Sequence, residues 1–328
     1  MKKHTKAFLN LALIFFLTGF VLYFSLKDNY QEILKHIFEI HTIYLFGAFL
    51  CLFGYYFFRM LSLHAMITEF KPDYTKKRTF RLVLITQFFN AITPFSSGGQ
   101  PFQVYHLKKD GVSITHGTNI VMQNFIVYQI ALVLLGLLAL LYNSFFHVFK
   151  EIPILKNLVT IGFCINTLVI VSLFFLAFSQ KFSGFLLKIL TKLWKKKADK
   201  IKKWDTYVQN FHQGAKRLFK NKKKLFQNIG CNFLGLICLY LVPYMILYGM
   251  GNHDLTVITC IVCSAYTMII GAFVPIPGAT GGLEYGYMSF FGQIVKGTVL
   301  NASMLLWRAI TYYFGLIVGA ITLSIKRK

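Results

Sequence analysis

The chain has 328 residues, of which 56% are hydrophobic and 14% are charged, and its formal net charge at pH 7 is +24. A soluble domain of this length does not bury so much apolar side chain, so the composition excludes a water-soluble protein and predicts an all-α integral membrane protein. The excess of Lys and Arg is typical of cytoplasmic loops beside anionic lipid head groups, and we prefer that explanation to a nucleic-acid partner.

Transmembrane segments are predicted from the length of helix that a bilayer core requires, about 20 apolar residues. Segments of this kind cover residues 7–26, 42–63, 116–142, 157–178, 229–249, 255–274 and 302–325. The first follows a basic N-terminus, as in a signal peptide, but it is long for one and lacks a small-residue cleavage site. We therefore predict an uncleaved first span and a single polytopic domain over residues 1–328.

The distribution of basic residues predicts the topology of this domain. Lys and Arg gather at the N-terminus, between Lys71 and Arg81, across residues 181–224 and in the last three residues. Because cytoplasmic loops carry the excess of positive charge, we expect both termini in the cytoplasm of a bacterial cell, with the chain in its plasma membrane.

Two apolar stretches, residues 80–106 and 275–300, are interrupted by Pro, Gly and polar residues. Lys108 and Lys109 should also be cytoplasmic, so residues 80–106 are predicted to enter from the cytoplasm and return to it as a re-entrant hairpin. If residues 282–300 cross completely, the chain makes about eight crossings.

The basic stretch 181–224 is not uniformly polar, because apolar and aromatic residues recur in it at helical spacing between the lysines. This pattern predicts amphipathic helices that lie on the inner membrane surface, with Lys on the head groups. The alternative is a solvated basic connector.

The two interrupted stretches contain an internal repeat, P-x-x-x-G-G-x-x-[FY], which begins at Pro94 and again at Pro277. Non-helical backbone at membrane depth is tolerated only where protein buries it or where it lines a wet cavity. Two such breaks therefore predict one cavity between two related halves, with helix N-termini that can bind an anion such as phosphate. The alternative is a pair of Pro-Gly turns at the surface.

Polar and charged residues near these breaks are the candidate lipid-binding residues. Charges inside spans are costly, by about 2.5–3.5 kcal/mol on insertion scales, so Arg59, Glu284 and Arg308 are functional candidates. Glu284 and Arg308 form the natural pair, either as a structural ion pair or with the Arg on a lipid phosphate. The full candidate set is Arg59, Arg81, Asn90, Thr93, Ser96, Ser97, Gly98, Gly99, Gln100, Gln103, Gly281, Gly282, Glu284 and Arg308.

The sequence offers no signal for covalent chemistry. We predict no catalytic residues, no cofactor and no metal, because the histidines are scattered and Cys260-Ile-Val-Cys263 has no second pair of ligands. No Walker motif is present, so we expect no direct use of ATP.

Three segments together resemble the membrane region of the lysylphosphatidylglycerol synthase/flippase family. They are Ile92-Thr-Pro-Phe-Ser-Ser-Gly-Gly-Gln-Pro-Phe-Gln103 followed by Leu107-Lys-Lys-Asp-Gly111, then Pro275-Ile-Pro-Gly-Ala-Thr-Gly-Gly-Leu-Glu284, and Trp307-Arg-Ala-Ile-Thr-Tyr-Tyr313. The resemblance runs over nearly the whole chain. In full-length members this region is joined to a cytoplasmic domain that transfers lysine from lysyl-tRNA to phosphatidylglycerol, and we expect no such domain in a sequence that ends at Lys328.

The resemblance implies a membrane lipid translocase that binds a phospholipid or aminoacyl-phospholipid head group such as phosphatidylglycerol or lysylphosphatidylglycerol, with anionic membrane phospholipid as a partner and a part in resistance to antimicrobial peptides. It also implies a homodimer or a separate lipid-modifying enzyme as partner. Two alternatives stay open. The chain could be a phosphatidylglycerol lysyltransferase, as the family name suggests, or a non-transporting membrane component of a glycolipid or polyprenyl-phosphate pathway.

Overall fold

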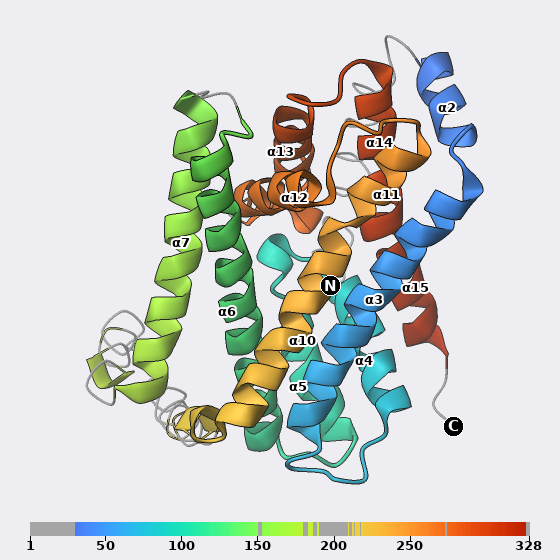
Figure 1. Cartoon of the computed structure of the whole chain (residues 1–328). Coiled ribbons are helices and arrows are strands. Elements are labelled where there is room, and N and C mark those ends of the chain that lie inside the picture. The colour runs from blue at the N-terminus through green and yellow to red at the C-terminus, as the bar shows by residue number, and fades with distance from the viewer. Residues whose placement is uncertain are drawn as a thin grey trace.

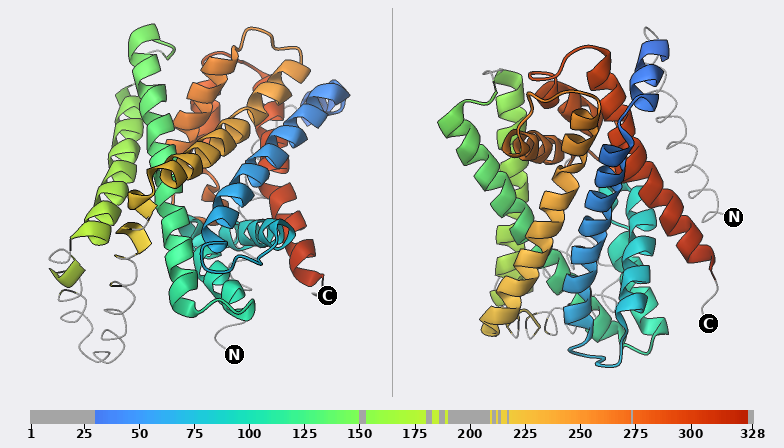
Figure 2. Two further views of the ribbon diagram at one scale, coloured as in Figure 1. Left: turned by 60° about the horizontal axis from the view of Figure 1, so that its bottom comes forward. Right: turned by 45° about the vertical axis from the view of Figure 1, so that its right-hand side comes forward.

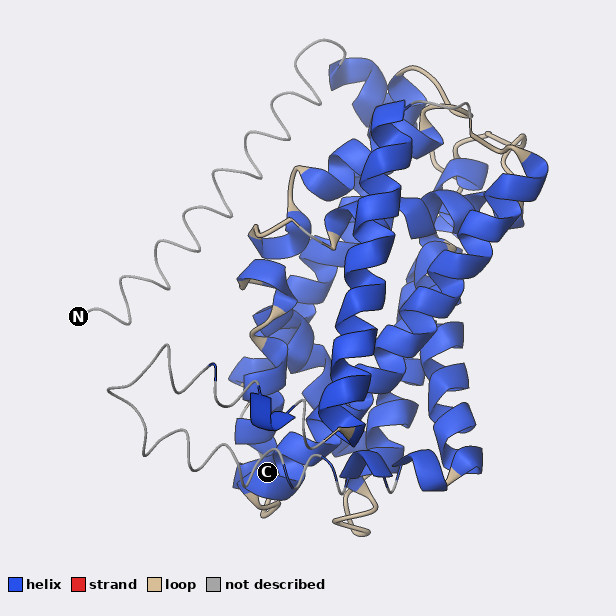
Figure 3. Ribbon diagram, turned by 90° about the vertical axis from the view of Figure 1, so that its left-hand side faces the viewer, coloured by secondary structure: helices blue, strands red, loops and turns tan. Residues whose placement is uncertain are grey.

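The computed structural model describes residues 30–149, 153–179, 183–185, 189, 209, 212, 214–216, 218–272 and 274–325. All regular secondary structure in these ranges is helical, which confirms the all-α class (Figure 3). The predicted first span at residues 7–26 and most of the predicted amphipathic loop at residues 181–224 lie outside the described residues.

Within the described residues, five helical stretches are long and apolar enough to cross a membrane, and each matches a predicted span. They are α3 (Thr42–Ile67), α6 (Ile114–Phe146), α7 (Pro153–Phe178), the pair α10 (Lys222–Tyr240) and α11 (Val242–Gly249), and the pair α14 (Thr298–Arg308) and α15 (Gly315–Ser324). A π-helical turn, Ala309–Phe314, joins the last two helices. A short helix, α2 (Tyr30–Phe38), packs against α14.

Local sequence determines where several of these helices begin. At the starts of α6 and α10, the side chains of Ser113 and Asn221 accept hydrogen bonds from the backbone N–H groups three residues later in the chain. Thr75 and Thr256 do the same for two shorter helices, α4 (Lys76–Ala91) and α12 (Val257–Gly271). Such caps satisfy backbone donors that have no partner within a helix.

The first interrupted segment folds as a hairpin. Helix α4 leads into a 3₁₀ turn at Pro94–Ser96, and α5 (Gly99–Lys109) runs back beside α4. Lys71 Nζ donates to the Asp110 carbonyl over 2.8 Å, and the Tyr74 hydroxyl donates to the Asp110 carboxylate over 2.7 Å. The chain therefore leaves the hairpin at the end where it entered.

The second interrupted segment folds in the same way. Helix α12 leads into a 3₁₀ turn at Pro277–Ala279, and α13 (Gly282–Phe291) returns along α12, where the Tyr266 and Phe290 rings lie 5.2 Å apart. At 1.5 Å per residue, the 15 residues of α12 span only about 22 Å of a core of about 30 Å. Residues 255–274 and 282–300, which the sequence suggests as separate crossings, are instead two arms of one re-entrant hairpin, because the helix stops at the break.

The two hairpins are inverted with respect to each other (Figures 1 and 2). The first opens at the end of the bundle where α3 finishes, beside Lys71. The second opens where α3 begins, because His41 N–H donates to the carbonyl of Gly249, shortly before α12. The two 3₁₀ turns contact each other between these ends, so the halves meet as inverted repeats.

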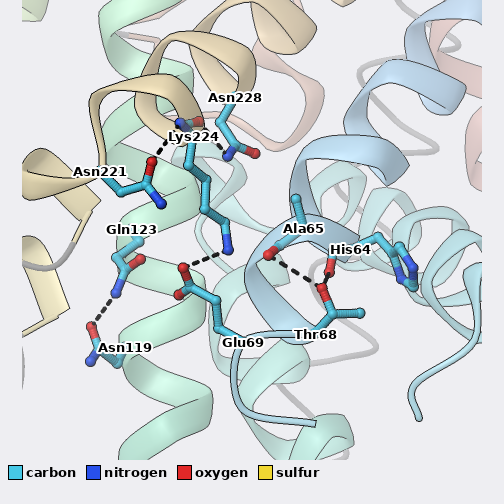
Figure 4. A network of polar contacts seen from close by, with 9 residues as sticks. All are labelled: His64, Ala65, Thr68, Glu69, Asn119, Gln123, Asn221, Lys224 and Asn228. Atoms are coloured by element: carbon cyan, nitrogen blue, oxygen red, sulfur yellow. Dashed lines mark hydrogen bonds and ion pairs between the residues drawn. The ribbon is translucent and has the colours of Figure 1, made fainter. Parts of the chain in front are cut away.

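Polar contacts lie at the end of the bundle where α3 meets α6 and α10 (Figure 4). Glu69, just after α3, forms an ion pair with Lys224 in the first turn of α10. Gln123 donates to Asn119 one turn earlier on α6, over 3.0 Å. This end also carries the basic 71–81 segment.

The hairpin topology predicts a labelling pattern. In a chain without its six native cysteines, Lys76→Cys and Lys109→Cys should react with an impermeant maleimide from one side of the membrane, and Asp254→Cys and Lys296→Cys from the other. The reason is that each hairpin returns to its own side. Opposite sidedness of positions 254 and 296 would show that the second hairpin crosses.

Candidate functional site

The sequence repeat corresponds to a repeat in backbone geometry. Both 3₁₀ turns, Pro94–Ser96 and Pro277–Ala279, have left-handed residues at their second position, Phe95 with φ 53° and Gly278 with φ 66°. The following helix starts at the second glycine of the Gly-Gly pair in both cases. The two breaks are therefore the same structural device in opposite orientations.

Side chains of the first half satisfy the backbone at the first break. Thr93 Oγ1 accepts the N–H of Gly98 over 2.8 Å and donates to the Phe89 carbonyl over 2.7 Å, and Asn90 Oδ1 accepts the N–H of Gly99 over 3.0 Å. A Cβ on Gly99 would lie 2.2 Å from that Oδ1. Glycine is required here because the capping side chain occupies the space.

A buried ion pair organises the second break. Glu284 Oε2 accepts the N–H of Gly281, which has φ 88°, over 2.7 Å, and Glu284 Oε1 lies 2.8 Å from Arg308 Nε. A terminal nitrogen of Arg308 donates to the Gly278 carbonyl over 3.1 Å and to Thr280 Oγ1 over 3.3 Å. Only 5% and 9% of the Arg308 and Glu284 side chains are exposed, so the pair holds the turn together.

A cavity of about 520 Å³ lies between the two breaks, and residues from both turns line it. Six of the fourteen predicted site residues reach it: Arg59, Asn90, Ser96, Gln100, Gln103 and Arg308. Other polar residues on α4, α6 and α7 also line it, namely Gln87, Asn124, Gln129 and Asn166. The breaks thus share one hollow interior instead of lying as separate surface turns.

The cavity reaches the outer surface of the protein at the first break. Phe95 is 61% exposed, and Ser96 and Ala272, which also line the cavity, are exposed. Phe95 and Ser96 belong to the 3₁₀ turn of the first hairpin, and Ala272 directly follows α12. The mouth of the cavity therefore lies where the turns of the two hairpins meet.

Arg59 supplies the cavity with a positive charge that no carboxylate neutralises within the described chain. One terminal nitrogen donates to Asn232 Oδ1 on α10 over 3.1 Å, and the guanidinium lies 4.3 Å from the centre of the Tyr128 ring. Asn232 Nδ2 in turn donates a hydrogen bond to Ser62 Oγ over 2.8 Å, and Ser62 Oγ donates one to Asn124 Oδ1 over 3.2 Å. This network fixes Arg59 to three helices while other guanidinium N–H groups remain for a ligand.

Eight predicted site residues do not line the cavity: Arg81, Thr93, Ser97, Gly98, Gly99, Gly281, Gly282 and Glu284. Most of them build the two breaks. Arg81 lies elsewhere, because it donates to the carbonyls of Thr322 and Ile325 and so caps the C-terminal end of α15. Asn119 and Gln123, two buried polar residues of α6, also lie outside the cavity lining.

Aromatic residues are the part of the lining that the sequence analysis missed. They are Tyr55, Tyr56, Phe95, Phe125, Tyr128, Tyr240, Trp307 and Tyr312. Aromatic residues are so common in this chain that their presence alone does not mark a site. Helical spacing could have identified some of them, because Leu52, Tyr55, Tyr56 and Arg59 lie on one face of α3. The described residues contain no group of three or more His, Cys, Asp or Glu that could hold a metal ion.

The ion pair predicts strong coupling in a double-mutant cycle. Glu284→Gln or Arg308→Gln alone should lower the free energy of unfolding in detergent by about 3–5 kcal/mol, because each strands a buried charge. The double variant should lose less than the sum, with a coupling energy of about 1–3 kcal/mol. Glu39→Gln is the control, since its pair with Lys35 is exposed and contributes about 0–1 kcal/mol. Additive losses would contradict the pairing.

The packing of the first break predicts that one added methyl group at Gly99 lowers the stability of the protein. Gly99→Ala should destabilise the protein by about 1–3 kcal/mol, because the new Cβ displaces the Asn90 cap. Gly230→Ala on α10 is the matched control, since nothing lies within 4 Å of its Cβ position, and it should be neutral or stabilising by up to about 1 kcal/mol. Equal stability of the two variants, measured by thermal unfolding, would refute the capping role.

Known membrane proteins are similar to this chain in sequence. The chain is 24% identical over 268 residues to a UPF0104 membrane protein of Archaeoglobus fulgidus, an alignment that covers 75% of each chain. Residues 8–319 match the family described as the lysylphosphatidylglycerol synthase TM region, and this match covers both hairpins, the cavity lining and the long helices as far as Gly319 in α15. The chain therefore belongs to the family of the lysylphosphatidylglycerol synthase TM region.

Proposed function

We propose that this membrane protein is a lipid translocase that binds the phosphate of an anionic phospholipid at Arg59. The observation that carries the proposal is the cation of Arg59 in a cavity between two mid-membrane breaks, without a carboxylate partner in the described chain. An intramembrane charge costs about 2.5–3.5 kcal/mol on insertion scales, and a bound anion offsets that cost. The planar guanidinium suits the two oxygens of a phosphate.

The shape of the site supports a substrate with long apolar chains. We propose that the mouth at Phe95 and Ser96, two exposed lining residues, opens toward the bilayer, so that acyl chains stay there while the head group enters the cavity. Exposed apolar residues on α6 and α7, such as Leu138 and Leu168, face the surrounding lipid. A soluble solute would gain nothing from a lateral opening.

The inverted hairpins support movement across the membrane. Two related elements that enter from opposite sides and meet at one site can open that site to each side in turn. The family name joins this membrane region to an enzyme of phosphatidylglycerol lipids, which is consistent with a phospholipid substrate. We place the protein in a bacterial plasma membrane with both termini cytoplasmic, and we assign it no covalent chemistry.

Reconstitution tests this function. Vesicles that contain the protein should move a short-chain fluorescent phosphatidylglycerol between leaflets, as measured by dithionite quenching. Arg59→Gln should slow that movement by about 10- to 100-fold, because a charge-assisted hydrogen bond to a phosphate contributes about 1.5–3 kcal/mol. Arg59→Lys should keep part of the rate, since it retains the charge without the planar fork.

Lys77→Gln is the matched control, because Lys77 is an exposed cation at the start of α4, away from the cavity. It should leave the rate unchanged. A normal rate in a folded Arg59→Gln variant would remove Arg59 from the mechanism, and the absence of movement in the wild-type protein would refute translocation.

A further inference from the structure

A second cavity, of about 360 Å³, lies at the end of the bundle where the second hairpin opens, and we call it the end cavity. Residues at the end of α6, the start of α7 and the open arms of the hairpin line it. The Phe149 ring lies 5.0 Å from that of Tyr266 on α12 and 5.1 Å from that of Phe290 on α13. Asn143 Oδ1 accepts the Phe149 N–H over 3.0 Å, so the chain after α6 is fixed against the second hairpin.

The end cavity carries the polar groups that a phosphate head group requires. Lys156 near the start of α7 and His147 just after α6 contribute basic side chains, and both are exposed at the surface of the protein. Asn143 and Gln293 contribute amides from α6 and from the chain after α13. A lysine ammonium binds phosphate as a point charge, and amide and imidazole N–H groups donate to its oxygens.

The end cavity and the cavity between the breaks lie along one seam, which α6, α7 and α12 form at the edge of the bundle (Figure 1). Leu132, Gly136 and Leu140 follow one face of α6 at intervals of about one turn. Leu132 lines the cavity between the breaks and Leu140 lines the end cavity, about 12 Å further along the helix. On α7, Asn166 and Val159 line the same two cavities.

A constriction separates the two cavities at Gly136, Phe163 and Ile269. The space there is only about 10 Å³, enough for about one water molecule, so a phosphate cannot pass in this conformation. A Cβ on Gly136 would lie 3.5 Å from both the Phe163 ring and the Ile269 side chain. Because glycine leaves that position without a side chain and Phe163 is only half-buried, rotation of the Phe163 ring would open the seam.

The lipid-facing surface of α7 beside the seam suits acyl chains. Ile161, Ile165 and Leu168 are 54%, 41% and 64% exposed, and Ile165 also lines the cavity between the breaks. A head group inside the seam can therefore stay joined to acyl chains that lie along α7 in the bilayer.

We propose that the end cavity is a second binding site for the phosphate of a membrane lipid, and that the head group passes between this site and Arg59 through the seam, with Phe163 as the gate. This inference rests on the proposed translocation and adds a second site and a route to it. The phosphate exchanges the guanidinium of Arg59 for the ammonium of Lys156, so a basic group accompanies its charge at both ends of the route. A soluble phosphate ester carries the same charge, but only a lipid also uses the apolar surface of α7.

Protection of a cysteine tests the end cavity. In a chain without its six native cysteines, Ser144→Cys places a thiol in the lining. In detergent, dihexanoyl phosphatidylglycerol should slow the reaction of this thiol with a maleimide at least fivefold, and Lys156→Gln should remove most of that protection. Lys296→Gln, which removes an exposed cation outside the lining, is the control and should leave the protection unchanged.

Two results would contradict a lipid site in the end cavity. Equal protection by glycerophosphoglycerol, which has the same head group without acyl chains, would show a site for soluble phosphate esters. Absence of protection, or protection that Lys156→Gln leaves unchanged, would overturn the phosphate site itself.

Transport in vesicles tests the seam. Gly136→Trp fills the constriction and should slow the movement of the fluorescent phosphatidylglycerol at least tenfold, whereas Leu138→Trp, at a 53% exposed position of the same helix, should leave the rate unchanged. Phe163→Ala removes the gate and should raise the rate at least threefold, which keeps the test decisive if Gly136→Trp folds poorly. A wild-type rate in Phe163→Ala, or in a folded Gly136→Trp variant, would overturn the route while leaving translocation through Arg59 intact. Absence of movement in the wild-type protein would overturn both proposals.

Discussion

Backbone N–H and C=O groups that lie outside a helix at membrane depth must find partners inside the protein, because lipid offers none. Both breaks of this chain meet that requirement with side chains. Thr93 and Asn90 serve the first break, and Glu284 and Arg308 serve the second. The Tyr312 hydroxyl joins the halves by donating to the Ala91 carbonyl over 3.1 Å at the end of α4.

This constraint separates structural polar residues from those available to a ligand. A residue that caps a break has its hydrogen-bonding groups engaged, and its removal should first appear as lost stability. Arg59 has a different position, because it lies on an unbroken helix and is held by Asn232 on α10. Arg59 is half-buried, and its charge is not required by either turn, which is why the proposed function gives it the lipid phosphate.

Much of the fold could be predicted from the sequence, because spans depend on the length of apolar runs and the repeat depends on Pro and Gly spacing. The inverted arrangement could not, since α12 and α13 have the composition of ordinary crossings and only the return of α13 along α12 shows that they are not. Six predicted residues line the cavity. The sequence does not show whether a polar side chain such as that of Asn90 already forms a hydrogen bond with the backbone instead of facing a ligand. The partner of Arg59 lies 173 positions away, a distance that no local pattern bridges.

The most direct test of the account is a cryo-electron microscopy structure of the full-length protein in nanodiscs that contain phosphatidylglycerol. The account predicts a lipid phosphate within hydrogen-bonding distance of the Arg59 guanidinium, with the Glu284–Arg308 ion pair intact and the acyl chains leaving past Phe95. A phosphate bound to Arg308 with that pair broken, or lipid found only on the outer surface of the helices, would contradict it.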